Sequence, residues 1–244
     1  MAETAVTGCK AAIAAAGPVL FPHHCLGCRE EGRLLCSACL AMTKAPLRGF
    51  SVCPTCHAVS QAGVRCGRAT CGKSALHAIV SMAPYREPLF RELVHAYKYE
   101  GIEEAGVVLR DLFSGFLRTQ ARAIRAVIPD DATVIPVPMH PLRFRSRGFN
   151  QTDVFAAAFA ATVGGTVDGG LLQRSFTRKT QVEMGEHTDR RTNVSGAVRA
   201  VGPVPVSCVV IDDVVTTGST LTACAEALRA AGACSVTAVT LLHG

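Results

Sequence analysis

The sequence predicts an α/β protein in which helices flank a parallel sheet, preceded by a small cysteine-rich domain. From about residue 76 onward, short apolar runs rich in β-branched residues alternate with longer segments of helical periodicity. Apolar residues make up 49% of the 244 residues, enough to bury the core of one large domain and a smaller one. We therefore predict two domains, over residues 1–74 and 75–244.

The N-terminal part indicates where the protein resides. Residues 1–22 form an alanine-rich lead without a basic start, and Lys10 interrupts its apolar stretch, so we expect no secretory signal. No uncharged apolar run reaches the roughly 20 residues that a membrane span needs. We expect a soluble, cytoplasmic protein, in which thiols stay reduced and closely spaced cysteine pairs indicate metal binding.

Eight of the twelve cysteines form two sets of four. The sets, in sequence order, are Cys25, Cys28, Cys36 and Cys39, then Cys53, Cys56, Cys66 and Cys71. Two neighbouring pairs can place four thiolates tetrahedrally at about 2.3 Å from zinc, and a short region without its own core needs such a metal to fold. We expect two structural zinc ions; an interleaved pairing of the same cysteines is the alternative, and His57 is a reserve ligand. The others are expected to be small buried hydrophobic residues: Cys9, Cys208, Cys224 and Cys234.

The expected elements of the larger domain follow from apolar spacing. Strands are predicted over segments 76–83, 133–137, 206–211 and 235–242. Helices with one apolar face are predicted over 87–99, 103–125, 151–163 and a last segment that ends at residue 231. Residues 173–196 are polar and lack a clear period, which predicts a long, mobile loop.

Two carboxylates and a run of hydroxyl residues follow the strand predicted over 206–211. The acids are Asp212 and Asp213, and the candidate ligand-binding residues after them are Val215, Thr216, Thr217, Gly218, Ser219 and Thr220. Their order places the hydroxyls at a helix N-terminus, where unpaired backbone N–H groups and the helix dipole favour an anion. An ordinary capped turn is the alternative. The complete strand before the loop and the amphipathic helix after it favour a ligand site.

A basic block follows the strand predicted over 133–137, where prolines take the chain out of the sheet. Arginine forks match phosphate oxygens in pairs, so this block could hold a phosphorylated group. A solvated basic turn is the alternative. The candidate ligand residues here are His140, Arg143, Arg147, Asn150 and Gln151. Lys98 is a further candidate, although a lysine near a helix end also complements the helix dipole.

Three blocks of the sequence resemble the phosphoribosyltransferase superfamily and, within it, the ComF family. They are residues 209–221, residues 134–151, and residues 180–197 with Thr180-Gln181, Arg190, Arg191 and Asn193. The cysteine-rich start and the residues 97–101 are similar to that family as well. The chain departs from the family pattern in the wider gap before Cys71 and at Met184-Gly185.

The resemblance implies a phosphoribosyltransferase-like fold with an N-terminal double zinc ribbon. It implies that 5-phosphoribosyl-1-pyrophosphate (PRPP) binds with Mg²⁺, that Asp212 and Asp213 steady the ribose as C1 gains oxocarbenium character, and that arginines hold the leaving pyrophosphate. The implied role is transfer to an unknown acceptor in DNA uptake during natural competence, with single-stranded DNA and DNA-uptake proteins as partners. One alternative is a nucleic-acid-binding zinc-ribbon module with a non-catalytic phosphoribosyl sensor; another is a nucleobase salvage phosphoribosyltransferase.

Overall fold

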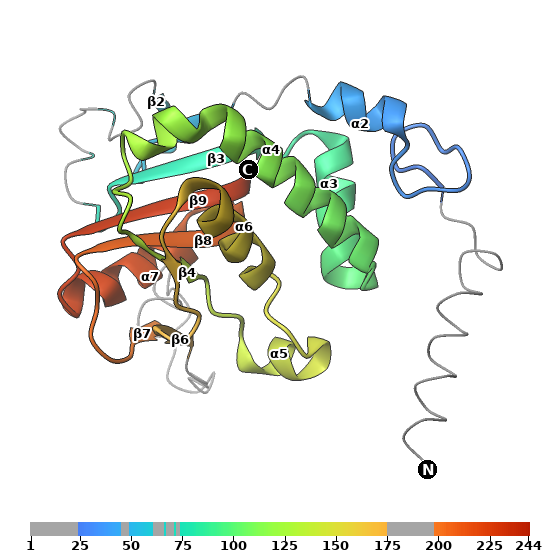
Figure 1. The fold of residues 1–244 in the computed structure, drawn as a ribbon. Coiled ribbons are helices and arrows are strands. Elements are labelled where there is room, and N and C mark those ends of the chain that lie inside the picture. Colours follow the sequence, from blue (N-terminus) through green and yellow to red (C-terminus); the bar gives the residue numbers. More distant parts are fainter. Residues whose placement is uncertain (1–23, 45–48, 61–65, 67–70, 72–73, 175–197) are drawn as a thin grey trace, which may run out of the picture. The chain divides into compact units, whose positions relative to one another are not determined.

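The computed structural model describes residues 24–44, 49–60, 66, 71, 74–174 and 198–244 (Figure 1). Its contacts divide the chain into two compact units. The first comprises the described part of Met1–Pro46 with Pro88–Leu109, and the second comprises Leu47–Glu87 with Arg110–Gly244. The predicted domain boundary after residue 74 concerns independent folding and stays a prediction. Among the described residues, no helix combines the length and the apolar character that crossing a membrane would require.

The first unit is helical. It contains α2 (Ser37–Lys44), α3 (Pro88–His95), the π-helical turn η2 (Ala96–Glu100) and the start of α4 (Glu103–Arg125). The predicted helices over 87–99 and 103–125 are confirmed, except that a π-helical turn completes the first of them. Glycine at position 106 is needed for packing, because a Cβ there would come within 2.5 Å of the Tyr97 ring.

Seven strands of the described residues form one sheet in the second unit, in the order β2-β1-β3-β9-β8-β4-β5. Their bounds are β1 (Phe50–Val52), β2 (Val59–Ser60), β3 (Ala78–Pro84), β4 (Thr133–Pro136), β5 (Thr166–Val167), β8 (Ser207–Val215) and β9 (Ser235–His243). The strands from β3 to β5 in this order pair in parallel, and β1 and β2 add antiparallel at the β3 edge. The predicted parallel sheet is confirmed, whereas the short strands β1, β2 and β5 were not predicted.

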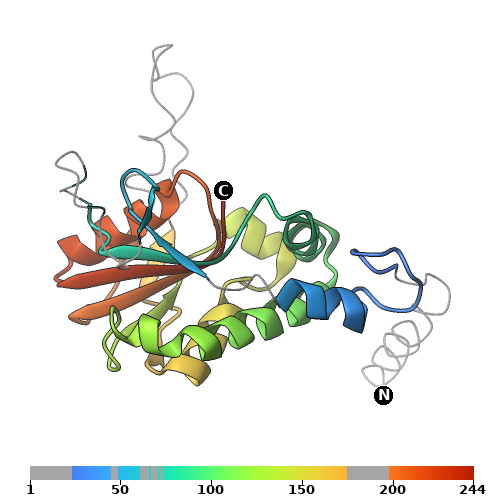
Figure 2. The ribbon, with the colours of Figure 1, turned by 90° about the horizontal axis from the view of Figure 1, so that it is seen from above.

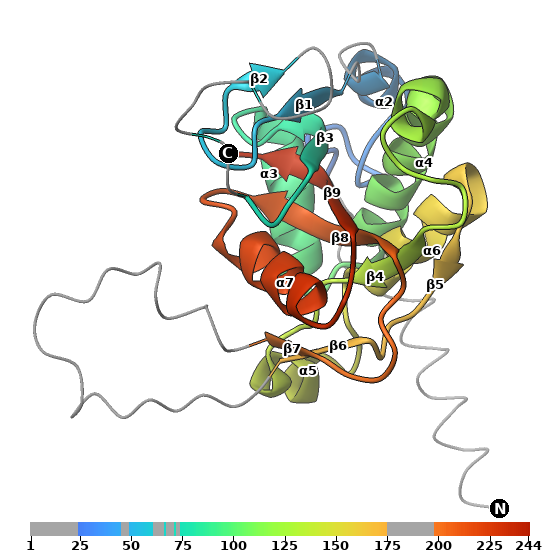
Figure 3. The ribbon, with the colours of Figure 1, turned by 90° about the vertical axis from the view of Figure 1, so that its left-hand side faces the viewer.

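Helices cover both faces of this sheet (Figure 2, Figure 3). Helix α6 (Asp153–Val163) and the part of α4 from Arg110 onward lie over one face, and α7 (Ser219–Ala230) lies over the other. Strands β8 and β9 are buried on both sides, so they read as near-continuous apolar runs. Their few buried polar groups are satisfied: the hydroxyls of Ser81 and Thr240 share a hydrogen bond of 2.7 Å.

The central strand β8 is longer than the sequence predicted. It continues beyond residue 211 to Val215, because Val214 and Val215 extend the β-branched run and pair with the end of β9. Asp212 and Asp213 therefore lie on the strand, and the expectation that they begin the loop was wrong.

A separate antiparallel pair, β6 (Leu172–Arg174) and β7 (Val198–Ala200), flanks the polar segment that was predicted to be a mobile loop. Residues 173 and 174 are thus in a strand, contrary to that prediction. Leu172 is buried in the core on the α7 side, which explains why this end of the segment is ordered. Residues 175–196 of the predicted loop lie outside the described residues.

Candidate functional site

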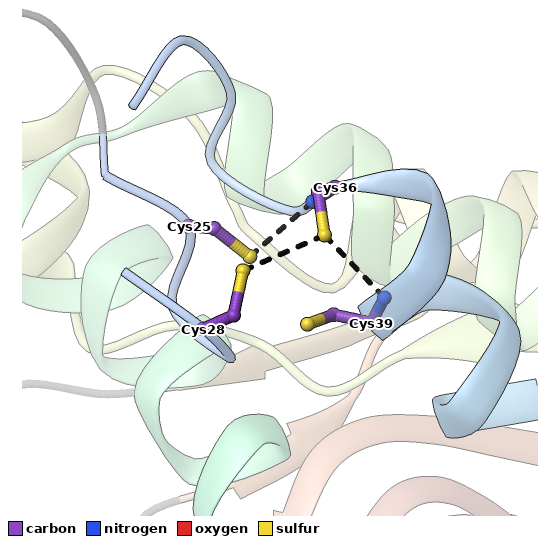
Figure 4. A group of neighbouring side chains, drawn as sticks. All are labelled: Cys25, Cys28, Cys36 and Cys39. Atoms are coloured by element: carbon purple, nitrogen blue, oxygen red, sulfur yellow. Dashed lines mark hydrogen bonds between the residues drawn. The ribbon is translucent and has the colours of Figure 1, made fainter. Parts of the chain in front are cut away.

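Four cysteine sulfurs converge in the first unit, and Figure 4 shows them pointing toward one another. The sulfurs of Cys25, Cys28, Cys36 and Cys39 all lie within 4.8 Å of one another, and those of Cys28 and Cys36 are 3.7 Å apart. Four thiolates arranged tetrahedrally at 2.3 Å from zinc would be about 3.8 Å apart. A Cβ at Gly27 would come within 2.6 Å of the Cys39 sulfur, so glycine is required there. The cluster therefore fits a metal ion.

The second cluster lies in the second unit, at the end of strand β1. The sulfurs of Cys53, Cys56, Cys66 and Cys71 also lie within 4.8 Å of one another, with 3.6 Å between Cys56 and Cys66. This grouping confirms the predicted pairing in sequence order. Either cluster could hold a metal ion with cysteine ligands alone, so neither needs a histidine.

The thiols within these clusters have widely different pKa values. Burial raises the pKa of Cys25, but backbone N–H groups, first that of Cys36, outweigh it and lower the pKa to about 6. Cys53 reaches about 6 in the same way, with the backbone of Cys66 as the main donor. Hydrogen bonding with the Cys36 thiol, burial and the neighbouring cysteines raise the pKa of Cys39 to about 12. Because thiolates so close together repel, a bound cation is what would stabilise all four in the charged form.

The loop between β8 and α7 carries the predicted anion-binding hydroxyls at the carboxyl edge of the sheet. Thr216 and Thr217 are exposed, Ser219 and Thr220 are partly exposed, and the Thr217 hydroxyl donates to Ser219 Oγ at 3.1 Å. Gly218 precedes the first residue of α7 with φ of 69°, a left-handed conformation that favours glycine. The loop is thus open to solvent at its threonines, as a site for an anion requires.

The two acids before this loop have different surroundings. They occupy consecutive positions on β8, so their side chains leave the strand toward opposite faces of the sheet. The Asp212 carboxylate accepts the backbone N–H of Asp213 at 2.9 Å. Burial, and secondly the charge of Asp212, raise the pKa of Cys224 in α7 to about 12. Asp213 is only 8% exposed. Their shared role in holding a ribose stays a prediction.

The predicted basic block forms a short helix, α5 (Pro141–Arg147), for which His140 provides the N-cap by accepting a backbone N–H. Arg143 is exposed, whereas Arg147 donates to the Gln151 side chain at 2.6 Å. The Asn150 side-chain amide donates to the backbone carbonyl of Val137, the residue after β4, at 3.1 Å, and to the Asp153 carboxylate at 2.9 Å. Asn150 and Gln151 therefore stabilise the connection from α5 to α6. Ligand binding by these residues stays a prediction.

The register of the sheet brings two of the predicted blocks to one edge. Pro136 of β4 pairs with Ile211 of β8, and the two strands run in the same direction. Because parallel strands end at the same edge, the basic block and the β8–α7 loop leave the sheet on the same side. Lys98 lies in η2 of the first unit, and its contact with a ligand stays a prediction.

Comparison with known proteins identifies the family. A model of the phosphoribosyl transferase domain matches residues 179–244. The chain is 30% identical over 221 residues to DNA utilization protein YhgH of Salmonella typhimurium, covering 88% of this chain and 94% of that protein. The chain belongs to the ComF/YhgH family.

Two competence proteins and one solved structure are less similar to this chain. Competence protein F of Haemophilus influenzae is 26% identical over 221 residues, covering 87% of this chain and 93% of that protein. Competence protein ComFC of Streptococcus pneumoniae is 25% identical over 157 residues, covering 63% of each. A solved hypoxanthine phosphoribosyltransferase from Staphylococcus aureus aligns with a TM-score of 0.35 and 13% identity, covering 55% of this chain and 62% of that chain.

Two residues at the loop of this ComF/YhgH protein were not predicted to belong to the site. A Cβ at Gly218 would lie 3.3 Å from Cε1 of His57, which follows Cys56. The Nδ1 atom of His57 lies 3.0 Å from Nε2 of His243, at the end of β9. The two histidines are 186 positions apart in the chain, so their contact could not be predicted from the sequence and depends on the fold.

The cysteines outside the clusters divide by position. Burial raises the pKa of Cys208 to about 11, and both Cys208 and Cys224 are buried as predicted. Cys234 is exposed, so its predicted burial was wrong; it lies in the turn between α7 and β9, where the chain reaches the surface. Cys9 lies outside the described residues.

Proposed function

We propose that this ComF/YhgH protein binds PRPP with Mg²⁺ at the β8–α7 loop and transfers the phosphoribosyl group in the handling of DNA taken up by the cell. The observation that carries this proposal is the open, hydroxyl-lined loop with left-handed Gly218 at the start of α7, inside the segment that matches the phosphoribosyl transferase domain model. The relatives named for DNA utilization and competence support the DNA context. The acceptor is not specified by any of these residues.

Each group of residues would contact a different part of PRPP. Backbone N–H groups of the loop and the α7 dipole would hold the sugar phosphate. Asp212 and Asp213 would accept hydrogen bonds from ribose hydroxyls as positive charge develops at C1. Arg143 and Arg147 would hold the pyrophosphate, which leaves with the electrons of its bond to C1. Asp212 and Asp213 would also help to hold Mg²⁺, which would neutralise part of the charge of the leaving pyrophosphate.

We propose zinc as the metal of both cysteine clusters. A tetrahedral set of four thiolates favours zinc, and a complete protein ligand set leaves no position for a reactive water, which supports a structural role. Elemental analysis of protein purified without chelator should find roughly two zinc ions per chain. Protein that is folded and contains no zinc would contradict this assignment.

Calorimetry with PRPP and Mg²⁺ tests the ligand. The wild type should bind, and Asp212→Asn or Asp213→Asn should each weaken binding roughly tenfold or more, because a hydrogen bond to a charged acceptor is lost. Asp131→Asn is the control, since it removes the same charge from an exposed position before β4. Absence of binding by the zinc-loaded wild type would refute the proposal.

A transferase and a sensor differ in turnover. Pyrophosphate release from bound PRPP, measured with a panel of nucleobases and with single-stranded DNA, should be detectable if the protein is a transferase. Release at the uncatalysed rate with every acceptor would favour the non-catalytic sensor instead.

One observation favours nucleic-acid binding as a second candidate function. Helix α5 and the residues after it expose Leu142, Phe144 and Phe149 beside the arginines of the block. Aromatic rings that stack on bases and cations that contact phosphates are the usual combination for binding single strands. A gel shift with single-stranded DNA should weaken with added salt and after Arg143→Ala with Arg147→Ala. Unchanged binding in both cases would rule out this role for α5.

A further inference from the structure

The second cysteine cluster holds His57 in an unusual conformation. His57 directly follows Cys56, and its backbone N–H donates to the Cys53 carbonyl at 2.9 Å, closing the turn. Its φ is 55°, in the left-handed region that is uncommon for residues other than glycine, although asparagine, aspartate and histidine adopt it more often than most. Arg29, which follows Cys28 of the first cluster, has a similar φ of 66°. Such a conformation persists only where the surroundings enforce it, and here the enforcing elements are the turn of the cluster and β1 before it.

The His57 ring lies between the cluster and the β8–α7 loop. Its Nδ1 atom contacts His243 Nε2 at 3.0 Å, and the neighbouring edge of the ring, formed by Cε1 and Nε2, faces Gly218 of the loop. A Cβ at Gly218 would lie 3.3 Å from Cε1 and 3.5 Å from Nε2 of that edge. Adjacent residues along the loop are the exposed Thr216 and Thr217.

His243 fixes the ring from the other side. It is the last residue of β9, paired with Val215 at the end of β8, and the Phe50 ring packs edge-on against it with 5.8 Å between centroids. His57 is thus held between the cluster, the end of β9 and the loop, and all of these belong to the second unit.

The hydrogen bond between the histidines determines what His57 offers to the loop. A neutral imidazole carries one proton; if His243 Nε2 donates to His57 Nδ1, the proton of His57 is on Nε2, at the edge facing Gly218. An anion in the loop selects this arrangement, because it accepts from that N–H.

We propose that His57 is a phosphate-binding residue of the β8–α7 loop, supplied by the second cysteine cluster, so that metal in the cluster and sugar phosphate in the loop stabilise each other. This inference rests on the proposed function, since it concerns the same ligand. The coupling is reciprocal: if metal tightens ligand binding, ligand must tighten metal binding by the same factor.

Three substitutions on zinc-loaded protein test this role by calorimetry with ribose 5-phosphate and with PRPP and Mg²⁺. His57→Asn tolerates the left-handed turn and can still reach His243, but is too short to reach the loop. It should keep its zinc and bind both ligands about 10- to 100-fold more weakly, the loss expected for one hydrogen bond to a charged group. His57→Gln, whose amide reaches as far as Nε2, should recover most of the affinity.

The control is His77→Ala, an exposed histidine just before β3 at the opposite edge of the sheet, which should bind as the wild type does. Unchanged affinity of His57→Asn beside a binding wild type would overturn the inference and leave the proposed function intact. A wild type that binds neither ligand would instead refute the proposed function.

Zinc release provides a readout independent of ligand calorimetry. With a coloured chelator, ribose 5-phosphate should slow the loss of one of the two zinc ions from the wild type and should not slow it in His57→Asn. Equal slowing in both proteins, or none in the wild type at saturating ligand, would contradict the coupling.

Discussion

The two cysteine clusters have the same ligands but are connected differently to their surroundings. The first joins a turn at Cys25–Cys28 to the start of α2 within the helical unit. The second follows β1, whose backbone pairs with β3 of the central sheet. His57, the residue after Cys56 of this cluster, packs against Gly218 of the β8–α7 loop. Identical sets of four cysteines can therefore stabilise different parts of the molecule, because the elements to which the ligands are attached decide what a bound metal would hold in place.

Removing cysteine ligands should show the largest difference between the two clusters. Cys53→Ser with Cys56→Ser should remove one zinc ion and abolish PRPP binding, because β1 and His57 lose their anchor. Structural zinc in small domains contributes about 10–16 kcal/mol of binding free energy, so this is the largest effect expected. Cys25→Ser with Cys28→Ser should also remove one zinc ion, but change PRPP affinity far less. Elemental analysis and calorimetry measure both, and equal loss of affinity in the two proteins would eliminate the distinction.

A smaller change, at Gly218 in the loop, should test the contact between His57 and the loop. Gly218→Ala introduces a Cβ at a φ of 69° and within 3.3 Å of His57, whereas Gly202→Ala has a φ of 81° with no atom within 4 Å of the added Cβ. Both should lose stability by about 1–2 kcal/mol from left-handed strain, measured by thermal unfolding. Only Gly218→Ala should also lose PRPP affinity. Equal affinity in the two variants would show that His57 and Gly218 are not closely packed in solution.

The smallest effect concerns the cysteines outside both clusters. Burial raises the pKa of Cys208 to about 11 and that of Cys224 to about 12, so at pH 8 only about one thiol in a thousand or fewer is a thiolate. Cys234 is exposed. Brief treatment of zinc-loaded protein with iodoacetamide should therefore modify Cys234 and leave Cys208 and Cys224 intact, as read by peptide mass spectrometry. Rapid modification of Cys224 would contradict the burial of this residue on the inner face of α7.

The elements predicted well from sequence are those whose own residues determine them. Helix α4 and strand β9 were predicted within one residue at each end, because their apolar spacing is long and regular. The two cysteine sets were also predicted correctly, because the short gaps between their members place the four sulfurs of each set close together. The prediction ended strand β8 at residue 211, because two consecutive carboxylates are typical of the start of a loop. In the structure, pairing with β9 extends the strand past them.

Other features depend on partners distant in the chain. β1 is only three residues long, and it is a strand because β3 pairs with it. The contact of His57 with His243 and Gly218 exists only once the sheet has brought the ends of β1, β8 and β9 together. Sequence spacing around Cys56 predicts a metal ligand there and carries no information about residue 218.

The antiparallel pairing of β1 has a consequence for the protein without zinc. In the sheet, β1 and β2 cover one side of β3, whose backbone N–H and C=O groups would otherwise face solvent. An uncovered strand edge is a template for pairing with another chain. Chelation of the metal in the second cluster should therefore detach β1 and expose the unpaired backbone groups of β3. Molecules should then associate through β3, and light scattering should rise.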